Sequence, residues 1–372
     1  MKIGVLRLKG RRWFSHRPLN ILFFGSDEFS MHSFRALDSL RKTSTMIGKL
    51  QLVSRPAKWC GRQKSQLKYP PIVTANQKLG SPLPLSCETS QDWANLRDIV
   101  ENDNYNMIVA VSFGKLISQE LLRHVKYSLN VHPSLLPRYK GASPIQYALL
   151  NRDEFTGVTV QTLDPLKFDH GTIVAQTEPL KIKDLLSKGT INQFDKETPL
   201  KTAILMDQLG LEGASLLVKV ILDRSYENPL KIISSYDPSY ASKISSRDKQ
   251  VDWSNESAES IVNKLQTVGP LYTHKEVQTK NNEVTLKRII FHSFSAVPEG
   301  LLIPQVLEAP GDFVYSKEDQ CLYVRCGKNS CITIHDLQFE GFKVENANQF
   351  ITSLRKRCGA AMCQNQKFTT QN

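Results

Sequence analysis

The stretch SLNVHPSLLPRYKGASPIQ, Ser128–Gln146, sets two polar side chains at the end of an apolar run. Asn130 and His132 are two residues apart, and side chains at positions i and i+2 leave the same face of a β-strand. The residues Pro-Ser-Leu-Leu-Pro follow at once. The pattern therefore predicts a strand that presents an amide and an imidazole side by side at its carboxyl end, an arrangement typical of a functional site.

Two other apolar runs precede this one and indicate an α/β fold. Ile21–Phe24 is closed by a glycine and followed by apolar residues at helical spacing, and Ser26 or Asp27 can cap that helix. Met107–Gly114 is a second short run closed by glycine, as expected for a parallel strand covered on both faces. The alternation predicts a doubly wound, Rossmann-like sheet, whose ligands bind beyond the carboxyl ends of the strands.

The chain beyond residue 150 divides into a hairpin, a helix, a linker and a β-rich end. Alternating residues from 157 to 180 predict a hairpin whose long tip contains Asp164, Asp169 and Gly171. Residues 198–222 predict a helix that closes the first domain, and the Ser-, Tyr- and Pro-rich stretch after it predicts a linker. Short β-like runs between residues 286 and 342 predict a small OB-like β-barrel.

The expected organisation therefore starts with a leader at residues 1–19 and an α/β domain at 20–222. A linker at 223–245 joins it to an OB-like domain at 246–355. A disordered tail is expected at 356–372.

All of the net charge lies near the start of the chain. The formal net charge is +12, and residues 1–70 hold fifteen Lys and Arg against three Asp and Glu, while residues 71–372 hold thirty-three of each. Residues 1–17 carry six of these bases and no acid, interleaved with apolar residues. This composition favours an organelle transit peptide over a disordered basic tail, and it indicates the mitochondrial matrix.

Membrane, metal and dinucleotide sites are not indicated. The chain has no run of the roughly 18 apolar residues that a membrane span needs, and we expect no membrane association. Its seven cysteines are an odd number, widely scattered and without a C-x-x-C pair, so we assign neither a disulfide framework nor a metal site. Neither the glycine-rich dinucleotide fingerprint nor a phosphate loop is present, so the Rossmann-like frame need not bind NAD.

The motif NVHPSLLPRYKGASPIQ, followed about forty residues later by LDPLKFDHGTIVAQ, closely resembles the 10-formyl-tetrahydrofolate-dependent formyltransferases. The family motif runs Asn-x-His-x-Ser-Leu-Leu-Pro and then Leu/Phe-Asp-x-Gly. The resemblance extends in order over residues 20–355, because YASKISSRDKQVDWSNESAESIV and the β-rich end are similar to the carboxyl-terminal domain of the members that act on methionyl-tRNA. It implies formyl transfer from 10-formyl-tetrahydrofolate to the α-amino group of initiator methionyl-tRNA.

The resemblance also implies the roles of individual residues. Asn130, His132 and Asp169 are implied to be catalytic, and the residues implied to line the folate site are Ser134, Leu135, Leu136 and Pro137. Formyl transfer places negative charge on the formyl oxygen, and an amide and an imidazole N–H can both donate to it, each donor being worth about 3 kcal/mol. Asp169 can stabilise a charged His132 and relay the proton that the amine loses.

The catalytic assignment has simpler alternatives. An isolated Asn-His pair is more often structural, and Asp-x-Gly is usually a turn, but their joint occurrence with the family motif favours catalysis. Asp164 competes with Asp169, and the glycine at 171 favours Asp169. Where the family usually has a glycine near the hairpin tip, this chain has Leu166, Lys167 and Phe168.

The segment SRPAKWCGRQKSQLKYPP, residues 54–71, has five bases, two aromatic residues and no acid. An arbitrary basic run is usually a solvated surface loop. Phosphate contacts supply most non-specific nucleic-acid affinity, however, and aromatic side chains stack on unpaired bases. The position of the segment resembles the inserted loop by which this family grips the acceptor end of tRNA. We therefore assign tRNA contacts to Lys58, Arg62 and Lys64.

Two other functions fit the same frame. Formylation of a small amine uses the same Asn-His-Asp core, but it requires neither the carboxyl-terminal β domain nor the basic loop. A catalytically idle RNA-binding protein does not require the three catalytic residues. The expected partners are therefore initiator methionyl-tRNA and the folate donor, and the chain is expected to act as a monomer.

Overall fold

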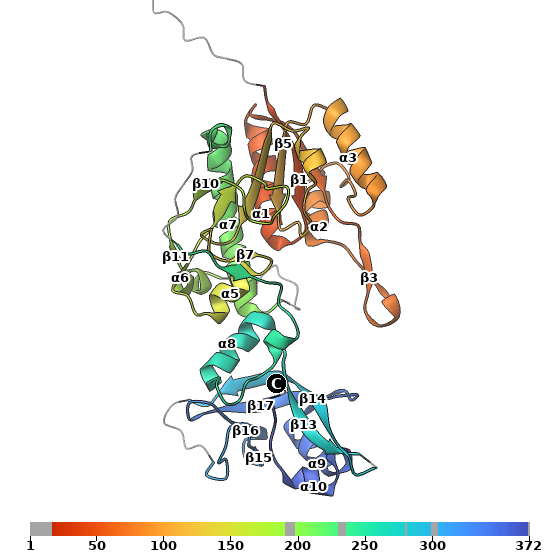
Figure 1. Cartoon of the computed structure of the whole chain (residues 1–372), viewed down its shortest axis with the longest axis vertical. Coiled ribbons are helices and arrows are strands. Elements are labelled where there is room, and N and C mark those ends of the chain that lie inside the picture. Colours follow the sequence, from red (N-terminus) through yellow and green to blue (C-terminus); the bar gives the residue numbers. More distant parts are fainter. Residues whose placement is uncertain (1–16, 190–197, 230–235, 280, 299–303, 371–372) are drawn as a thin grey trace, which may run out of the picture. The chain divides into compact units, whose positions relative to one another are not determined.

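The computed structural model describes residues 17–189, 198–229, 236–279, 281–298 and 304–370. The described residues form two compact units (Figure 1). The first unit contains those of 1–132, 158–176 and 210–233, and the second contains those of 133–157, 177–209 and 234–372. Most of the expected leader, residues 1–16, lies outside the described residues.

A six-stranded sheet forms the centre of the first unit, in the order β10-β9-β6-β5-β1-β2. Strands β2, β1, β5 and β6 are parallel, and β9 pairs antiparallel with both β6 and β10. The strands are β1 (Leu19–Gly25), β2 (Ile47–Val53), β5 (Met107–Val111), β6 (Tyr127–His132), β9 (Thr159–Gln161) and β10 (Ile173–Gln176). This arrangement confirms the predicted Rossmann-like α/β fold.

The helices of the first unit cover both faces of the sheet. They are α1 (Glu28–Thr43), α2 (Pro71–Lys78), α3 (Ser90–Asn102), α4 (Gln119–Leu122) and the 3-10 turn η2 (Ser225–Glu227). Phe23 of β1 meets Phe34 of α1 with ring centroids 5.3 Å apart, whereas Leu22 and Phe24 join a core cluster with α3. Because both faces are buried, the strand is a continuous apolar run rather than an alternating one.

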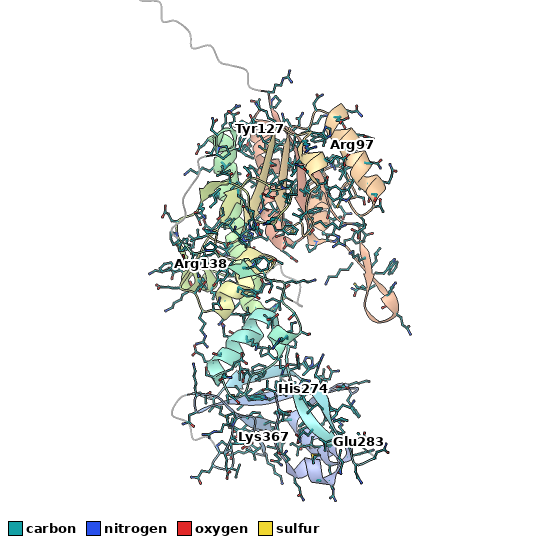
Figure 2. All side chains as sticks on the ribbon, in the orientation of Figure 1. Arg97, Tyr127, Arg138, His274, Glu283 and Lys367 are labelled. Atoms are coloured by element: carbon teal, nitrogen blue, oxygen red, sulfur yellow. The ribbon has the colours of Figure 1, made fainter. Side chains whose placement is uncertain are left out.

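The ends of α1 and β6 match the local sequence. Asp27 caps α1, as one of the two predicted candidates, and its Oδ1 accepts from the Ser30 N–H at 3.1 Å. At the start of β6, the ring of Tyr127 meets that of Tyr226 edge to face at 4.8 Å (Tyr127 is labelled in Figure 2). Residues 210–222 of α7 (Leu200–Leu222) pack against Val131 and Val158, on the sheet face opposite Asn130 and His132.

An antiparallel sheet dominates the second unit, in the order β13-β14-β17-β16-β15, with β18 paired to β17. Its strands are β13 (Leu271–Gln278), β14 (Val284–Ala296), β15 (Phe313–Ser316), β16 (Cys321–Cys326), β17 (Ser330–Phe339) and β18 (Val344–Asn346). The other elements are β7 (Lys140–Gly141), α5 (Pro144–Leu150), β8 (Phe155–Thr156), β11 (Leu180–Lys181), α6 (Ile182–Ser187), β12 (Tyr240–Ala241), η3 (Arg247–Lys249), α8 (Ala258–Val268), α9 (Ala347–Cys358) and α10 (Ala360–Gln364).

The end of the chain closes this sheet into a small barrel and corrects the expectation of a disordered tail. Thr369 bridges to His274 of β13, and Lys367 bridges to Asp312 beside β15, so the final segment links the two edge strands (His274 and Lys367 are labelled in Figure 2). Phe368 is buried, and its ring stacks on that of Phe313 at 4.3 Å. The sequence concealed this order because one aromatic side chain in a polar stretch creates no periodicity.

The described units do not follow the expected domain boundaries. Helix α5 packs on α8, where Asn263 Nδ2 donates to the Leu149 carbonyl at 2.9 Å. Thr202 Oγ1 of α7 donates to the Thr267 carbonyl at 2.7 Å. Part of the expected linker also pairs with the second unit, because β12 is parallel to β7. Hydrogen bonds between residues far apart in sequence therefore attach residues 133–157 and 177–209 to the carboxyl-terminal barrel.

Candidate active site

The carboxyl end of β6 brings together the three residues implied to be catalytic. Asn130 and His132 leave the same face of β6, and the carboxylate of Asp169 lies against both. Asn130 Nδ2 donates to Asp169 Oδ1 at 3.2 Å, and His132 Nδ1 lies 3.2 Å from the same oxygen. The side chains of His132 and Asp169 are 6% and 7% exposed. A buried cluster with one carboxylate, one imidazole and one amide results.

Asp169 is held in place by its loop between β9 and β10. Its backbone has a φ of 57°, a left-handed conformation that Asp tolerates better than most residues. The loop closes by hydrogen bonds between Thr162 and Thr172, each 2.8 Å long. A Cβ on residue 171 would lie 1.7 Å from the Thr162 carbonyl oxygen. Only glycine therefore permits this close approach, which explains the Asp-His-Gly sequence in physical terms.

Asp164, the alternative candidate for the catalytic carboxylate, forms hydrogen bonds within the hairpin tip instead. Its Oδ1 accepts from the main-chain N–H groups of Leu166 and Lys167 at 2.8 and 2.9 Å. These hydrogen bonds lower the pKa of Asp164 below its ordinary value. Asp164 thus caps the turn at the hairpin tip, as Asp residues commonly do in turns. Leu166 and Phe168, also at this tip, are exposed.

Gln161 joins the cluster although no sequence motif pointed to it. It pairs with Asn130 in the antiparallel register of β6 and β9, so the two side chains lie on the same face. Gln161 Nε2 donates to Asp169 Oδ1 at 3.0 Å, and the residue is 1% exposed. The available sequence signal was a polar residue directly after Val158, Thr159 and Val160, but its partner depends on a strand register that the sequence does not reveal.

The hydrogen bonds of the cluster restrict what each group can do. Two N–H groups, from Asn130 and Gln161, donate to one oxygen of Asp169, and His132 Nδ1 lies 3.2 Å from the same oxygen. The carboxylate beside Nδ1 of His132 holds a proton on that nitrogen and orients the ring. The other ring nitrogen, Nε2, lies on the edge that faces away from Asp169. The arrangement can donate hydrogen bonds to a developing oxyanion and can stabilise an imidazolium.

Another carboxyl group lies at the same edge of the sheet, beyond β1. Burial raises the pKa of Asp27 to about 6, although hydrogen bonds from the Ser30 main chain and the Ser112 side chain act in the opposite direction. Ser112 directly follows β5, so this contact joins the ends of two neighbouring strands. The carboxyl edge thus contains a second acid, separated from β6 by β5.

The residues implied to line the folate site belong to the second unit. Ser134, Leu135 and Leu136 are buried, while Pro137 is partly exposed. Ser134 Oγ donates to the Arg138 carbonyl at 2.6 Å. Arg138 in turn donates to Asp153 at 2.6 Å and lies over the ring of Tyr139 (Arg138 is labelled in Figure 2). This segment is therefore a packed turn held by its own side chains.

The basic segment forms an exposed hairpin of β3 (Lys58–Cys60) and β4 (Gln66–Lys68), with η1 (Arg62–Lys64) at its tip (Figure 1). We call residues 58–68 the basic hairpin. Lys58 and Lys64 are exposed, as is Trp59, which has 60% of its surface accessible. The side chain of Arg62 lies outside the part that the structure describes.

Ion pairs to Glu88 hold the root of the basic hairpin. Arg55 donates twice to its carboxylate at 3.1 Å, Lys115 donates at 3.0 Å, and Lys58 lies 3.8 Å away. The Arg55 guanidinium and the Lys115 ammonium hold the pKa of Glu88 at about 2. The hairpin is thus anchored at its base by charge and is exposed along its length.

Neither a metal cluster nor a membrane span emerges from the part of the chain that is described. Among these residues, no group of three or more His, Cys, Asp or Glu side chains could hold a metal ion. None of the described helices is long and apolar enough to cross a membrane.

Known proteins resemble this chain along most of its length. Residues 19–199 match the family model described as Formyl transferase, and residues 243–355 match Formyl transferase, C-terminal domain. A Saccharomyces cerevisiae protein, methionyl-tRNA formyltransferase, mitochondrial, is 48% identical over 368 residues, covering 92% of this chain and 91% of that relative. The Homo sapiens protein of the same description is 28% identical over 318 residues, covering 83% and 72%.

A solved structure shows the same fold at low sequence identity. HypX from Aquifex aeolicus in complex with tetrahydrofolic acid superimposes with a TM-score of 0.51 and 12% identity. The match covers 91% of this chain and 48% of HypX, so the chain spans about half of that protein. At this identity the likeness concerns the fold alone.

Proposed function

We propose that this chain, which belongs to the formyl transferase family, uses Asn130, His132 and Asp169 as its catalytic residues. The chain transfers a formyl group from 10-formyl-tetrahydrofolate to the α-amino group of methionyl-tRNA, in the mitochondrial matrix. The observation that supports the residue assignment is the convergence of Asn130 and His132 on one oxygen of Asp169, in a buried cluster at the carboxyl end of β6.

Asn130 and His132 are suited to stabilise the negative charge of the transition state. The amine nitrogen bonds to the formyl carbon, and the formyl oxygen becomes negative before the bond from that carbon to N10 of the folate breaks. The Asn130 amide has two N–H donors, and only one of them is needed for Asp169. The second can donate to the formyl oxygen. His132 Nε2 can donate to it as well once the ring has taken up a proton and become an imidazolium, and each such donor is worth about 3 kcal/mol at an oxyanion site.

Asp169 is suited to manage the positive charge and the proton. The attacking amine becomes cationic and loses a proton, while N10 of the departing tetrahydrofolate gains one. A carboxylate against His132 Nδ1 stabilises the imidazolium form, so the imidazole can accept the proton and return it. The residues present can therefore stabilise both charges.

Substrate contacts are assigned to two segments outside the cluster. Because Ser134, Leu135 and Leu136 are buried, we infer that they shape the folate site mainly through the main chain and the packing of the turn, with Pro137 more accessible. Lys58, Arg62 and Lys64 of the basic hairpin meet the acceptor end of tRNA. The carboxyl-terminal barrel supplies further tRNA contacts.

We keep the domain boundaries suggested by the sequence: a catalytic domain at 20–222, a linker at 223–245 and a tRNA-binding domain at 246–355. The family models, which match residues 19–199 and 243–355, support this organisation. We further infer that the chain acts as a monomer. Its substrate is initiator methionyl-tRNA, and the product primes translation in mitochondria.

Residues 1–19 are proposed as the transit peptide, on the evidence of their basic and acid-free composition. A protein that begins at Leu19 should then fold and catalyse normally in vitro, but it should not enter isolated mitochondria. Import of the shortened protein at the wild-type rate would contradict the assignment.

A label-transfer assay tests the proposed function. The protein is incubated with formyl-labelled 10-formyl-tetrahydrofolate and either methionyl-tRNA, free methionine or a small amine, and we expect label on methionyl-tRNA alone. His132→Ala should lower turnover by about a hundredfold or more. His124→Ala is the matched control, because His124 also pairs with a carboxylate, that of Glu101 at 3.0 Å, but on the surface. Equal turnover in both variants would remove His132 from the site.

A further inference from the structure

Gln161 contacts the catalytic cluster but belongs to none of the motifs that define it. Its amide Nε2 donates to Asp169 Oδ1 at 3.0 Å, closer than the 3.2 Å contacts from Asn130 and His132. It comes from β9, the strand next to β6, and lies directly opposite Asn130. The carboxylate is therefore held from two strands, and β9 contributes a group that the sequence pattern did not assign.

Stability of the fold does not by itself explain a buried amide at position 161. The side chain is 1% exposed, and its Oε1 has no hydrogen-bond partner within the part of the chain that the structure describes. A buried acceptor without a partner destabilises a fold, whereas an apolar side chain of the same length avoids that penalty. Val158 and Val160 show that β9 readily accepts apolar residues. The hydrogen bond to Asp169 is the favourable interaction that accounts for an amide at this position.

The carboxylate also determines which way the amide points. If the amide were reversed, Oε1 would face Asp169 Oδ1, and two oxygens with partial or full negative charge would repel each other. The observed orientation places the donor on the carboxylate and leaves Oε1 unpaired. The interaction with Asp169 therefore outweighs the penalty at Oε1.

We propose that Gln161 is a positioning residue that fixes the carboxylate of Asp169 against His132 throughout the reaction. This inference rests on the proposed catalytic role of Asp169. Asn130 and His132 each also contact the reacting groups, through an N–H or nitrogen that Asp169 does not use. Gln161 has no such task, so its hydrogen bond holds Asp169 independently of the two side chains that contact the substrate. Asp169 lies in a loop, with its main chain in the left-handed conformation. The loop fixes this main chain but not the side chain, so a further hydrogen bond is needed to hold the carboxylate.

Gln161→Met tests the proposal, because methionine keeps the length of the side chain and removes the donor. We expect kcat to fall by about ten- to a hundredfold, as for removal of a hydrogen bond to a charged group. The KM values for methionyl-tRNA and for the folate donor should stay within about twofold of wild type, and the melting temperature should not fall. In an Asp169→Asn background the same substitution should have almost no further effect on kcat, since the amide acts through the carboxylate.

Two further variants complete the experiment. Gln176→Met is the matched control, because Gln176 on β10 donates to the Thr159 hydroxyl at 2.9 Å instead of to Asp169, and its kcat should remain at the wild-type level. Gln161→Glu should lower kcat more than Gln161→Met does, because it sets a second carboxylate against Asp169. Should Gln161→Met not fold, Gln161→Asn replaces it, since the shorter amide cannot reach Asp169 from the same backbone.

The outcomes distinguish failure of the positioning role of Gln161 from failure of the catalytic assignment of Asp169. A Gln161→Met enzyme with wild-type kcat, alongside an inactive Asp169→Asn enzyme, overturns the role of Gln161 and leaves the proposed catalytic residues intact. The role of Gln161 is also overturned if Gln161→Met lowers kcat by the same factor in the wild-type enzyme and in the Asp169→Asn enzyme. The amide would then not act through Asp169. An Asp169→Asn enzyme of wild-type activity instead overturns the catalytic assignment of Asp169, and the role of Gln161 with it.

Discussion

The buried cluster at the end of β6, which we propose to be catalytic, and the basic hairpin differ in almost every physical respect. In the cluster, the side chains of His132 and Asp169 are 6% and 7% exposed, and three nitrogen atoms lie within 3.2 Å of a single carboxylate oxygen. In the hairpin, the described side chains are largely exposed, and the fixed contacts lie at its root, around Glu88. The first region thus has the fixed positions that the proposed bond making requires, and the second has the exposed charge that the proposed contact with a polyanion requires.

Within one unit of the protein, the proposed chemistry and the proposed tRNA recognition therefore depend on different kinds of interaction. Buried hydrogen bonds act in a medium of low dielectric, so a small displacement costs much of their energy. Exposed Lys and Arg interact with phosphate through screened, long-range attraction that tolerates displacement and responds to salt. Substitutions in the two regions should therefore change different measured quantities, and the larger effects are expected in the cluster.

The largest effect should come from the loop that carries Asp169. Gly171→Ala places a methyl group 1.7 Å from the Thr162 carbonyl oxygen, so the loop must move. We expect turnover to fall by more than about a hundredfold and the free energy of unfolding to fall by about 3 kcal/mol. Gly80→Ala is the control for adding a methyl group without a clash: residue 80, unlike residue 171, has a positive φ, of 64°, but nothing lies within 4 Å of a Cβ there. It should cost about 1 kcal/mol and leave turnover unchanged. Wild-type turnover in Gly171→Ala would contradict the need for this loop geometry.

Asn130→Ala should separate the two regions most cleanly. It removes a donor from Asp169 and, by the proposed mechanism, from the formyl oxygen, so we expect kcat to fall by about a hundredfold. The affinity for methionyl-tRNA, measured by filter binding, should stay within about twofold of wild type, because the residue is not assigned to RNA contact. A weakened tRNA affinity with normal kcat would break the separation between the cluster and the hairpin.

The converse result is expected for the basic hairpin. Neutralising Lys58, Arg62 and Lys64 together should reduce tRNA affinity and lower the slope of log affinity against log salt by about one for each phosphate that the hairpin no longer neutralises. Arg62→Ala alone should cost about 1–3 kcal/mol if it contacts a specific group, and less if it meets only phosphate. Turnover at saturating tRNA and binding of the folate donor should not change.

A matched charge control exists in the same unit. Lys78, Arg123 and Lys219 are exposed, lie outside the hairpin and carry the same three charges. Their triple Ala variant should retain most of the tRNA affinity. If both triple variants alter affinity and salt slope equally, net charge rather than the hairpin governs binding.

The smallest effect is expected at the root of the hairpin. The Arg55 and Lys115 side chains hold the pKa of Glu88 at about 2, below its ordinary value of 4.5, so the ion pairs contribute stability above pH 4.5. That contribution is lost as the pH falls from 4.5 toward 2. Because Glu88 is 35% exposed, solvent screens the pairs, and Glu88→Gln should cost no more than about 1 kcal/mol at pH 7.

Unfolding of wild type and Glu88→Gln by urea, repeated between pH 7 and pH 2.5, checks this sign. The difference between the two proteins should shrink as the pH falls. A difference that is constant over this range would show that the carboxylate charge of Glu88 does not stabilise the hairpin root.

The sequence by itself determined the α/β fold, the polar pair at the end of β6 and the exposed basic segment at residues 54–71. Periodicity and local chemistry encode such features: a run buried on both faces is continuously apolar, side chains two apart on a strand share a face, and a stretch of bases without acids is solvated. The start of the first helix at Ser26 or Asp27 belongs here too, because a helix start restricts which residues fit, although only the structure selected Asp27 as the cap.

Only the tertiary structure decided which groups meet across the chain. The choice between Asp164 and Asp169 depends on which carboxylate the hairpin turns toward β6, and the position of Gln161 depends on the register of β9 against β6. The burial of Phe368 depends on a gap between two barrel edges that are far apart in sequence. Each is a contact between distant residues, which local propensity does not encode because its energy appears only once the intervening chain has folded.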